Sequence, residues 1–362
     1  MKKDVKDTFV PVYWRGNYKD VEETVAIVKR GKVTKLLPSA GGRNIYMVEY
    51  GTSNLPQSTA TISSALGAKD IRCYADKTHP DYIPTVMLVG CMHGGEWEGT
   101  VAINNLIKLL ETGTDYAGNR NDKVLELCSK VHLVLIPMSN PDGRCRVPFD
   151  NFVGKSFEDL RYYDQGTWLN GELCGWPGCK QFHPIKDHVE FLGGYFNDDG
   201  VNMMHDDFFL NPSNEVKNVL TAARDNAPDM TLLYHGGDNG INHFVTNPYC
   251  SAESKRQLAD LGKEFTENFA KEGLRFGIRE DYASFNDEAG AVAPSFSFPS
   301  AMYHVCGEPA TTYESNQGLC DRGNYSLNND EIYRCHMISI ETTIDWTLRN
   351  KSAEARLAKA AK

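Results

Sequence analysis

The sequence predicts an α/β fold in which helices cover both faces of a mainly parallel sheet. Two observations lead to this class. Short β-rich runs alternate along the chain with longer segments of helical periodicity, and neither an internal repeat nor a Pro-, Ser- or Gly-rich linker divides the chain. Strands that alternate with helices are typical of βαβ units, which build parallel sheets. We therefore expect one domain over residues 1–362.

The expected strands are short runs of β-branched, aromatic and other apolar residues, too short and too β-rich for helices. The expected helices have apolar residues three and four positions apart. In chain order, the strands are expected at 44–48, 85–89, 131–136, 231–234 and 310–313, and the helices at 100–110, 215–224, 251–271 and 329–349.

Two segments depart from this alternation. Residues 147–199 show little periodicity but many Gly, Asp, Asn and aromatic residues. A loop of this length inside a compact domain is usually functional or disordered, and its Trp168 and Trp176 argue against disorder. The tail at 350–362 is expected to be a polar, frayed helix without a function.

Composition and charge exclude several classes of partner. The 362 residues carry a formal net charge of −10, which gives no general attraction to nucleic acid or anionic membranes. No apolar run approaches the roughly 18 residues of a membrane helix, and no signal peptide is visible at the start. The ten cysteines lack the spacing of a disulfide scaffold, which favours reduced thiols. We expect a cytoplasmic protein, although a removed leader would leave no trace, and its oligomeric state stays open.

His93 and Glu96 lie where an expected strand turns into an expected helix. In MLVGCMHGGEWEGT (87–100), an apolar run ends shortly before two glycines, which these two residues flank. The carboxyl end of a strand is a common place for chemistry in α/β folds. An imidazole and a carboxylate three positions apart can point into one small volume, as the first two ligands of a divalent metal must.

A third ligand candidate, His235 in TLLYHGGDNG, also ends a β-rich run and precedes glycines. Parallel strands place their carboxyl ends at one edge of the sheet, so the long separation in sequence is no obstacle. Zinc in hydrolases typically takes three protein ligands and leaves a position for water. The three residues therefore predict one Zn²⁺ per chain.

Glu314 in ATTYESNQG ends a further β-rich run at the same expected edge. A zinc-activated water needs a base that takes its proton and passes it to the leaving amine. A glutamate that is not itself a ligand fits this role, and Glu308 in HVCGEPA is the competing candidate.

Six motifs, taken together and in this order, make the sequence resemble the zinc carboxypeptidase family typified by carboxypeptidase A. They are SAGGRNIYMVEYG (39–51), HGGEWEG (93–99), NPDG (140–143), GVNMMHDDF (200–208), LLYHGG (232–237) and TTYESNQG (311–318). The resemblance spans about residues 20–348. It implies a mixed sheet of about eight strands between helices, zinc on the three ligands above, and Glu314 as general base and then acid.

One motif departs from the family. In a typical member an Asn-Arg pair binds the C-terminal carboxylate of the substrate, whereas Met204 and His205 stand here, followed by Asp206 and Asp207. Imidazole does not replace a bidentate guanidinium without loss, and two aspartates would repel a free carboxylate. With His205 and Asp206 at the substrate, we expect the substrate to carry a cationic, neutral or blocked group at this position. The protein is therefore not expected to be a conventional carboxypeptidase.

The resemblance also implies an arginine at the oxyanion and a mobile tyrosine at the substrate. Arg146 is the preferred arginine because it closely follows the NPDG turn, and Arg144 and Arg161 are alternative substrate-binding candidates. Tyr282 in EDYASFND is the candidate tyrosine, although its spacing to Glu314 is longer than in the family.

The insertion at 147–199 falls between the NPDG and GVNMMHDDF motifs. We expect it to form one wall of the substrate cleft and to narrow the range of substrates. Its Cys174, Cys179, His183 and His188 are spaced C-x4-C-x3-H-x4-H. They indicate either a second, structural zinc site or a plain loop with buried cysteines.

Three functions are compatible with these residues. The leading one is a zinc-dependent metallopeptidase that hydrolyses an amide bond in a peptide or peptide-like substrate. The second is a zinc-dependent deacylase or amidohydrolase of small acylated amines or amino acids. The third is a non-catalytic relative that binds peptides, which the presence of all four site residues disfavours.

Overall fold

A central sheet of eight strands organises the computed structural model, which describes residues 9–237, 241–245, 247–279, 294–321 and 325–360. The strand order is β1-β2-β4-β3-β7-β10-β8-β9. The strands are β1 (Lys32–Lys35), β2 (Tyr46–Tyr50), β3 (Thr85–Val89), β4 (His132–Ile136), β7 (Met230–Gly237), β8 (Asn242–Val245), β9 (Phe276–Arg279) and β10 (Ala310–Asn316). β4, β3, β7 and β10 are mutually parallel, as are β8 and β9, and the other pairs are antiparallel. This mixed, mostly parallel sheet confirms the predicted fold class.

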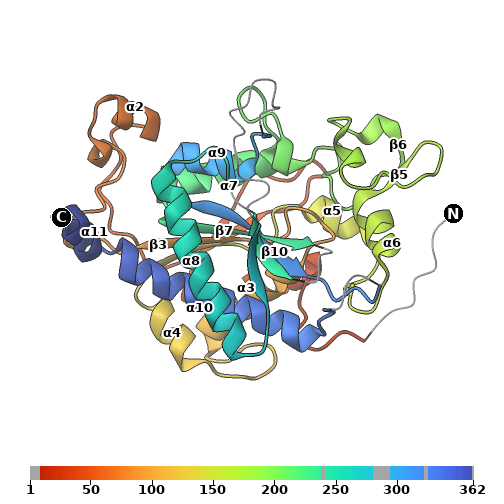
Figure 1. Cartoon of the computed structure of the whole chain (residues 1–362), viewed down its shortest axis with the longest axis horizontal. Helices are drawn as coiled ribbons and strands as arrows, with labels where there is room; N and C mark the ends of the chain where they lie inside the picture. Colours follow the sequence, from red (N-terminus) through yellow and green to blue (C-terminus); the bar gives the residue numbers. More distant parts are fainter. Residues whose placement is uncertain (1–8, 238–240, 246, 280–293, 322–324, 361–362) are drawn as a thin grey trace.

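Helices cover both faces of the sheet (Figure 1). α3, α4, α8 and α10 lie on one face, and α7 and α9 lie on the other. The helices are α1 (Tyr18–Ala26), α2 (Ile62–Gly67), α3 (Glu98–Thr112), α4 (Asp122–Cys128), α5 (Pro141–Arg146), α6 (Phe157–Leu160), α7 (Asn214–Asn226), α8 (Ala252–Lys271), α9 (Phe298–Cys306), α10 (Asn329–Lys351) and α11 (Ala353–Ala360). Of the helices in the described ranges, none has the length and apolar character needed to span a bilayer.

The central strand β3 shows why this sheet needs two covered faces. All five of its residues are buried. Val86 and Leu88 pack in the core beneath α3, α8 and α10, while Met87 and Val89 pack in the core beneath α7 and α9. Side chains alternate between the two faces of a strand, so a continuous apolar run is stable only where both faces are covered.

The expected elements compare well with the observed ones where the apolar pattern is strong. The strand expected at 85–89 is β3 itself, and the four expected helices correspond to α3, α7, α8 and α10. The sequence analysis does not predict β1, β8 and β9. These strands have four residues each and lie toward the edges of the sheet, where backbone pairing with a neighbour, rather than an apolar run, makes the strand.

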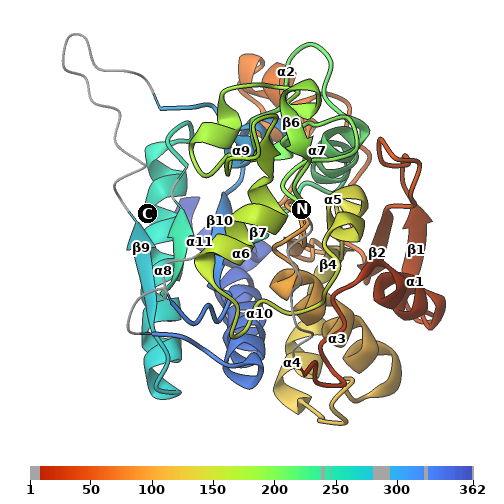
Figure 2. The same ribbon diagram turned by 90° about the vertical axis from the view of Figure 1, so that its right-hand side faces the viewer.

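The insertion is ordered around a small core of its own. It contains α6, a π-helical turn η2 (Arg161–Gln165), a two-stranded sheet of β5 (Thr167–Trp168) and β6 (Val189–Phe191), and the 3₁₀ turns η3 (Gly178–Lys180) and η4 (Lys186–His188). A further 3₁₀ turn, η5 (Met203–His205), follows it, and η1 (Ile71–Cys73) lies earlier in the chain. Figure 2, in which the insertion faces the viewer, shows α6 in front of β7 and β10.

The C-terminal tail is anchored, which corrects the expectation of a frayed helix. Arg356 of α11 contacts Asp229, and it donates a 2.7 Å hydrogen bond to Glu308. Lys351 and Lys77 also lie within ion-pair distance of Glu308. This cluster removes Glu308 as a catalytic base, because its carboxylate is paired with three cations at the amino end of β10, away from Glu314.

A buried histidine in α10 predicts acid sensitivity. Burial lowers the pKa of His336 to about 4, whereas an unfolded histidine titrates near 6.5. Between these two pH values the unfolded chain binds more protons than the folded chain does. The free energy of unfolding therefore falls by about 3 kcal/mol as the pH drops from 6.5 to 4. We expect His336→Phe to lose this part of the pH dependence in urea unfolding at pH 7, 6 and 5. His79→Phe, at a histidine whose side chain is 43% exposed, should keep it, and equal slopes for His336→Phe and wild type would contradict the assignment.

Candidate active site

The turn between β3 and α3 carries the first two predicted ligands. The backbone N–H of Glu96 donates to the carbonyl of His93, which closes the turn, and His93 Nδ1 lies 2.9 Å from Glu96 Oε1. Both side chains are buried, at 2% and 5% exposure. Local chain geometry alone therefore brings the imidazole and the carboxylate together, as the HxxE spacing predicts.

Gly94 lets this turn lie against α5. A Cβ at position 94 would lie 2.0 Å from the backbone carbon of Gly143 and 2.2 Å from the backbone nitrogen of Arg144. Real Cβ atoms do not approach backbone this closely, so one of the two segments must move.

We expect Gly94→Ala to destabilise the protein by several kcal/mol and to weaken metal binding. Gly67→Ala is a matched control, because a Cβ at the end of α2 meets nothing within 4 Å and alanine is the better helix former by about 1 kcal/mol. Thermal unfolding of both variants checks this, and equal melting temperatures would contradict it.

His235 completes a three-residue set from the neighbouring strand β7. Its Nδ1 lies 2.8 Å from Glu96 Oε2 and 3.2 Å from His93 Nδ1. The three ligand atoms lie within 4.8 Å of one another, and all three residues are buried. Two nitrogens bound tetrahedrally to one zinc at 2.0–2.1 Å would lie about 3.3 Å apart. The donor set and its spacing therefore fit Zn²⁺.

The surroundings prepare these groups to act as ligands. His93 Nε2 lies 3.3 Å from Asn202 Oδ1; donation from this nitrogen leaves the Nδ1 lone pair directed at the site. Burial lowers the pKa of His93, which favours the neutral imidazole that a metal needs. Burial alone would raise the pKa of Glu96, but the contacts with His93 and His235 outweigh it and lower the pKa to about 2.

Glu314 lies beside His235 in the sheet. The two residues are partners in the parallel register of β10 and β7, and register partners on parallel strands project from the same face. The negative charge of Glu314 acts on His235, Asp164 and Lys180. Glu314 is half-buried. A carboxylate next to the ligand set, outside it and in reach of solvent, is placed as a proton carrier must be.

The insertion packs directly against the metal-binding residues, as expected for a wall of the site. The ring of Tyr195 stacks on His93 with 3.4 Å between centroids. The backbone N–H of Gly94 donates to Gly194, and that of Gly95 donates to Asp164 Oδ1 at 3.0 Å. Burial, and then the charge of Glu96, raises the pKa of Asp164, so this carboxyl tends toward its neutral form.

His205 lies next to a lysine that the insertion supplies. Lys180 Nζ donates a 2.9 Å hydrogen bond to His205 Nε2. Burial, followed by the charge of Lys180, lowers the pKa of His205 to about 3, so the imidazole is neutral. Asp206 instead accepts from the backbone N–H groups of Asp207 and Ser213, both at 2.7 Å. Its carboxylate stabilises its own loop, and the repulsion of a substrate carboxylate by Asp206 stays a prediction.

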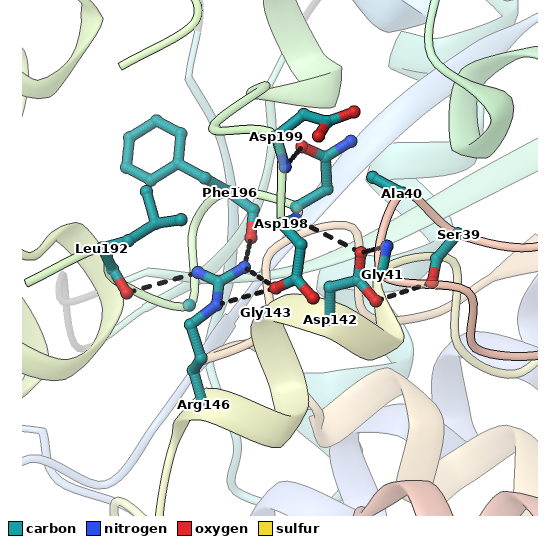
Figure 3. A network of polar contacts seen from close by, with 12 residues as sticks. Ser39, Ala40, Gly41, Asp142, Gly143, Arg146, Leu192, Phe196, Asp198 and Asp199 are labelled. Atoms are coloured by element: carbon teal, nitrogen blue, oxygen red, sulfur yellow. Dashed lines mark hydrogen bonds and ion pairs between the residues drawn. The ribbon is translucent and has the colours of Figure 1, made fainter. Parts of the chain in front are cut away.

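Arg146 holds the end of the insertion in place (Figure 3). Its guanidinium donates to the backbone carbonyls of Leu192, Gly193 and Phe196, and it pairs with Asp198 at 3.3 Å. These four acceptors take up most of the N–H donors of the Arg146 guanidinium. Because its donors are engaged in this way, the prediction of an oxyanion role for Arg146 is corrected. The carbonyls belong to the aperiodic insertion, where no sequence pattern marks them as partners of an arginine.

The same network joins two of the sequence motifs to the insertion (Figure 3). Asp142 of the NPDG motif accepts from Ser39 Oγ at 2.6 Å and from the backbone N–H of Gly41 at 2.8 Å. Arg43 bridges Asp142 and Asp198. These contacts connect the early strand motif and α5 to the end of the insertion.

The other arginines also have structural partners. Arg144 donates to the carbonyls of Gly16, Val147 and Phe149 and lies over the ring of Trp97. Arg161 lies over the ring of Phe157 within the insertion. Neither contacts the metal-binding residues, so their predicted substrate-binding roles are not supported. Tyr282 lies outside the described residues.

The C-x4-C-x3-H-x4-H set does not form a second metal site. Cys174 and Cys179 are buried in the small apolar core of the insertion. His183 pairs with Asp206 at 3.6 Å, and His188 stacks on Phe182. Throughout the ranges that the structure describes, His93, Glu96 and His235 form the only cluster suited to a metal. The alternative of a plain loop with buried cysteines holds.

Sequence reasoning missed four residues at this site: Asn202, Asp164, Lys180 and Tyr195. Asn202 carries a signal, since it stands in the GVNMMHDDF motif. The other three lie in the insertion, where neither periodicity nor a motif distinguishes them from their neighbours.

A buried His-Glu-His set at the carboxyl ends of parallel strands, with a glutamate beside it, defines an α/β zinc hydrolase. The model of the family described as zinc carboxypeptidase matches residues 29–332. The chain therefore belongs to the zinc carboxypeptidase family. No curated protein matches it in sequence.

Solved structures of metallocarboxypeptidases share the fold. A metallo-carboxypeptidase from Burkholderia cenocepacia is 16% identical, with a TM-score of 0.55 over 91% of this chain and 69% of that one. A metallo-carboxypeptidase from Pseudomonas aeruginosa, in complex with (2-guanidinoethylmercapto)succinic acid, is 16% identical, with a TM-score of 0.53 over 91% and 68%. Carboxypeptidase A from Helicoverpa armigera is 14% identical, with a TM-score of 0.52 over 94% and 74%.

Proposed function

We propose that this protein is a zinc-dependent hydrolase that cleaves an amide bond in a peptide or peptide-like substrate. The observation that carries the proposal is the convergence of His93 Nδ1, His235 Nδ1 and the Glu96 carboxylate in a buried site, with Glu314 in register beside His235. Two imidazoles and one carboxylate are a donor set of catalytic zinc sites, which leave one position open.

The three ligands would hold one Zn²⁺, which when bound polarises a carbonyl and makes water acidic enough to react near neutral pH. Glu314 takes a proton from the attacking water while the water oxygen forms a bond to the carbonyl carbon. When the C–N bond breaks, Glu314 delivers that proton to the leaving nitrogen, so the products are a carboxylate and an amine. Tyr195 and Asn202 hold the ring of His93 in place, by stacking and by a hydrogen bond.

The expected oxyanion contribution of an arginine is not part of this proposal, because Arg144 and Arg146 are engaged with carbonyls. The missing arginine at position 205 also separates this chain from a conventional carboxypeptidase. The insertion lies against the ligands, and its bulk supports a narrow range of substrates.

Metal reconstitution combined with a substrate panel tests the proposal. The protein is stripped with a chelator and titrated with zinc, and amine release is followed for free-carboxylate peptides, C-amidated peptides and N-acyl amino acids. We expect activity to rise with zinc and to level off at one ion per chain. Faster turnover of N-acyl amino acids than of any peptide would favour the deacylase alternative. Full zinc binding without turnover of any amide would identify a non-catalytic relative.

A further inference from the structure

Two consecutive glycines stand immediately before the metal ligand Glu96. Glycine has the widest backbone freedom of all residues, so Gly94 and Gly95 by themselves would leave the direction of the Glu96 side chain poorly fixed. Position 95 has no room for a side chain, because a Cβ there would lie 2.4 Å from Asp164 Oδ1. A carboxylate of the insertion fills that space, so the order of the turn has to come from its partners.

Side chains from two distant parts of the chain take up both polar groups of the Gly95 backbone. Its N–H donates to Asp164 Oδ1 at 3.0 Å, and its carbonyl accepts from Gln317 Nε2 at 2.9 Å; both bonds are buried. Asp164 belongs to the π-helical turn η2 of the insertion, and Gln317 directly follows β10. Three segments therefore meet at one residue of the turn that carries two metal ligands.

Gln317 connects this turn to the strand that supplies the third ligand. A Cβ at Gly236, the residue after His235, would lie 2.6 Å from Gln317 Cδ, so the amide packs closely against β7. The side chain is only 1% exposed. Because the same amide donates to Gly95, it links the segment that holds Glu96 to the segment that holds His235.

Asp164 connects the turn to the insertion in two ways. It is 2% exposed, and it lies in a turn closed by a 3.1 Å bond from the N–H of Gly166 to the carbonyl of Arg161. Such π-helical turns are rare and are frequent at functional sites. The backbone carbonyl of Asp164 accepts from the N–H of Tyr195 at 2.7 Å, and the ring of Tyr195 stacks on His93.

We propose that Asp164 and Gln317 are positioning residues for the metal ligand Glu96, which they hold through the N–H and the carbonyl of Gly95. The inference rests on the proposed zinc site and gives the insertion a role in metal affinity. A ligand group that is already held in its bound direction loses less conformational freedom when the metal binds. With either bond removed, Gly95 is free to turn about the other, so the two contributions are coupled.

The zinc affinity of single and double variants tests the inference. Asp164→Ala and Gln317→Met each remove one bond to Gly95, and Kd for zinc is measured by competition with a zinc-binding dye. We expect each variant to raise Kd by about 10- to 100-fold, the usual effect of losing a partner that orients a metal ligand. The double variant should raise Kd by less than the product of the two single effects, because both bonds hold the same residue.

Asp164→Asn separates the hydrogen bond from the charge. Asparagine keeps an oxygen that accepts from Gly95 but carries no negative charge, so Kd should stay close to the wild-type value. The absorption bands of the cobalt-substituted protein report the geometry of the ligands. They should change in Asp164→Ala and in Gln317→Met, and remain as in the wild type in Asp164→Asn.

Two matched controls remove polar groups elsewhere in the fold. Asp115→Ala removes an 8% exposed carboxylate that accepts from the N–H of Asn119 at 2.8 Å, beyond the carboxyl end of α3. Gln257→Met removes an amide of α8 that accepts from Lys351. Both controls should keep the wild-type Kd for zinc, whatever their effect on the melting temperature of the zinc-free protein.

Hydrogen exchange supplies a measurement that needs no substitution. The N–H of Gly95 is bonded to a buried carboxylate in the protein without metal, so it should exchange slowly in the zinc-free wild type. Fast exchange of this N–H in the folded, zinc-free protein would overturn the inference, because the turn would then be unheld before the metal binds.

Three results with the variants would also overturn it. Lower melting temperatures with unchanged Kd in Asp164→Ala and Gln317→Met would make the two residues merely structural. Equal losses of affinity in Asp164→Asn and Asp164→Ala would assign the effect to charge. Single effects that multiply in the double variant would exclude a shared hold on Gly95. A wild type that binds zinc but hydrolyses no amide would reject the proposed function alone, because these affinities need no turnover.

Discussion

Glu314→Gln is expected to lower kcat by about 10²–10⁴-fold while the protein still binds one zinc ion per chain. The range is the usual contribution of general acid–base catalysis. Glutamine has nearly the same shape but does not take up the proton that the attacking water must lose. Zinc is retained because Glu314 lies beside His235 in the sheet register and is not one of the three ligands.

Steady-state kinetics and metal analysis on the same preparation measure both parts of this prediction. Glu354→Gln is the matched control, because Glu354 is an exposed glutamate in α11, far in the fold from the carboxyl end of β10. Undiminished kcat with full zinc occupancy would move the proton transfer to another group. Loss of zinc in Glu314→Gln would instead mean that this carboxylate is a ligand.

His235→Ala is expected to abolish both zinc binding and the stabilisation that zinc confers. A ligand that binds only the folded state stabilises it by about 2.7 kcal/mol when its free concentration is 100 times Kd. Removing one of three donors leaves His93 and Glu96, which belong to a single turn and hold a metal weakly on their own. In addition, Glu96 loses its 2.8 Å contact with His235.

Competition with a zinc-binding dye measures the affinity, and melting temperatures with and without zinc measure the stabilisation. We expect a zinc-dependent rise for the wild type and none for His235→Ala. His205→Ala removes a nearby histidine outside the donor set and should keep the rise. Equal zinc affinity in His235→Ala and wild type would exclude His235 from the ligand set.

The sequence alone determined the fold class and the metal centre, because both follow from local or topological rules. His93 and Glu96 meet within one turn, so their three-residue spacing is sufficient. His235 and Glu314 end apolar strands, and the carboxyl ends of neighbouring parallel strands share an edge of the sheet. The continuous apolar run of β3 likewise predicts a buried strand, since such a run is stable only where both faces of the strand are covered.

The tertiary structure alone determined how the charged residues of the site are used. The direction of a guanidinium or an ammonium depends on which carbonyls and rings fold back onto it. Arg146 follows the NPDG turn as expected, but carbonyls from the insertion take up its donors. Lys180 carries no motif, yet it reaches His205 across 25 positions in sequence. An aperiodic segment such as 147–199 encodes these contacts only through its packing, so the charge beside the metal centre could not be read from the order of its residues.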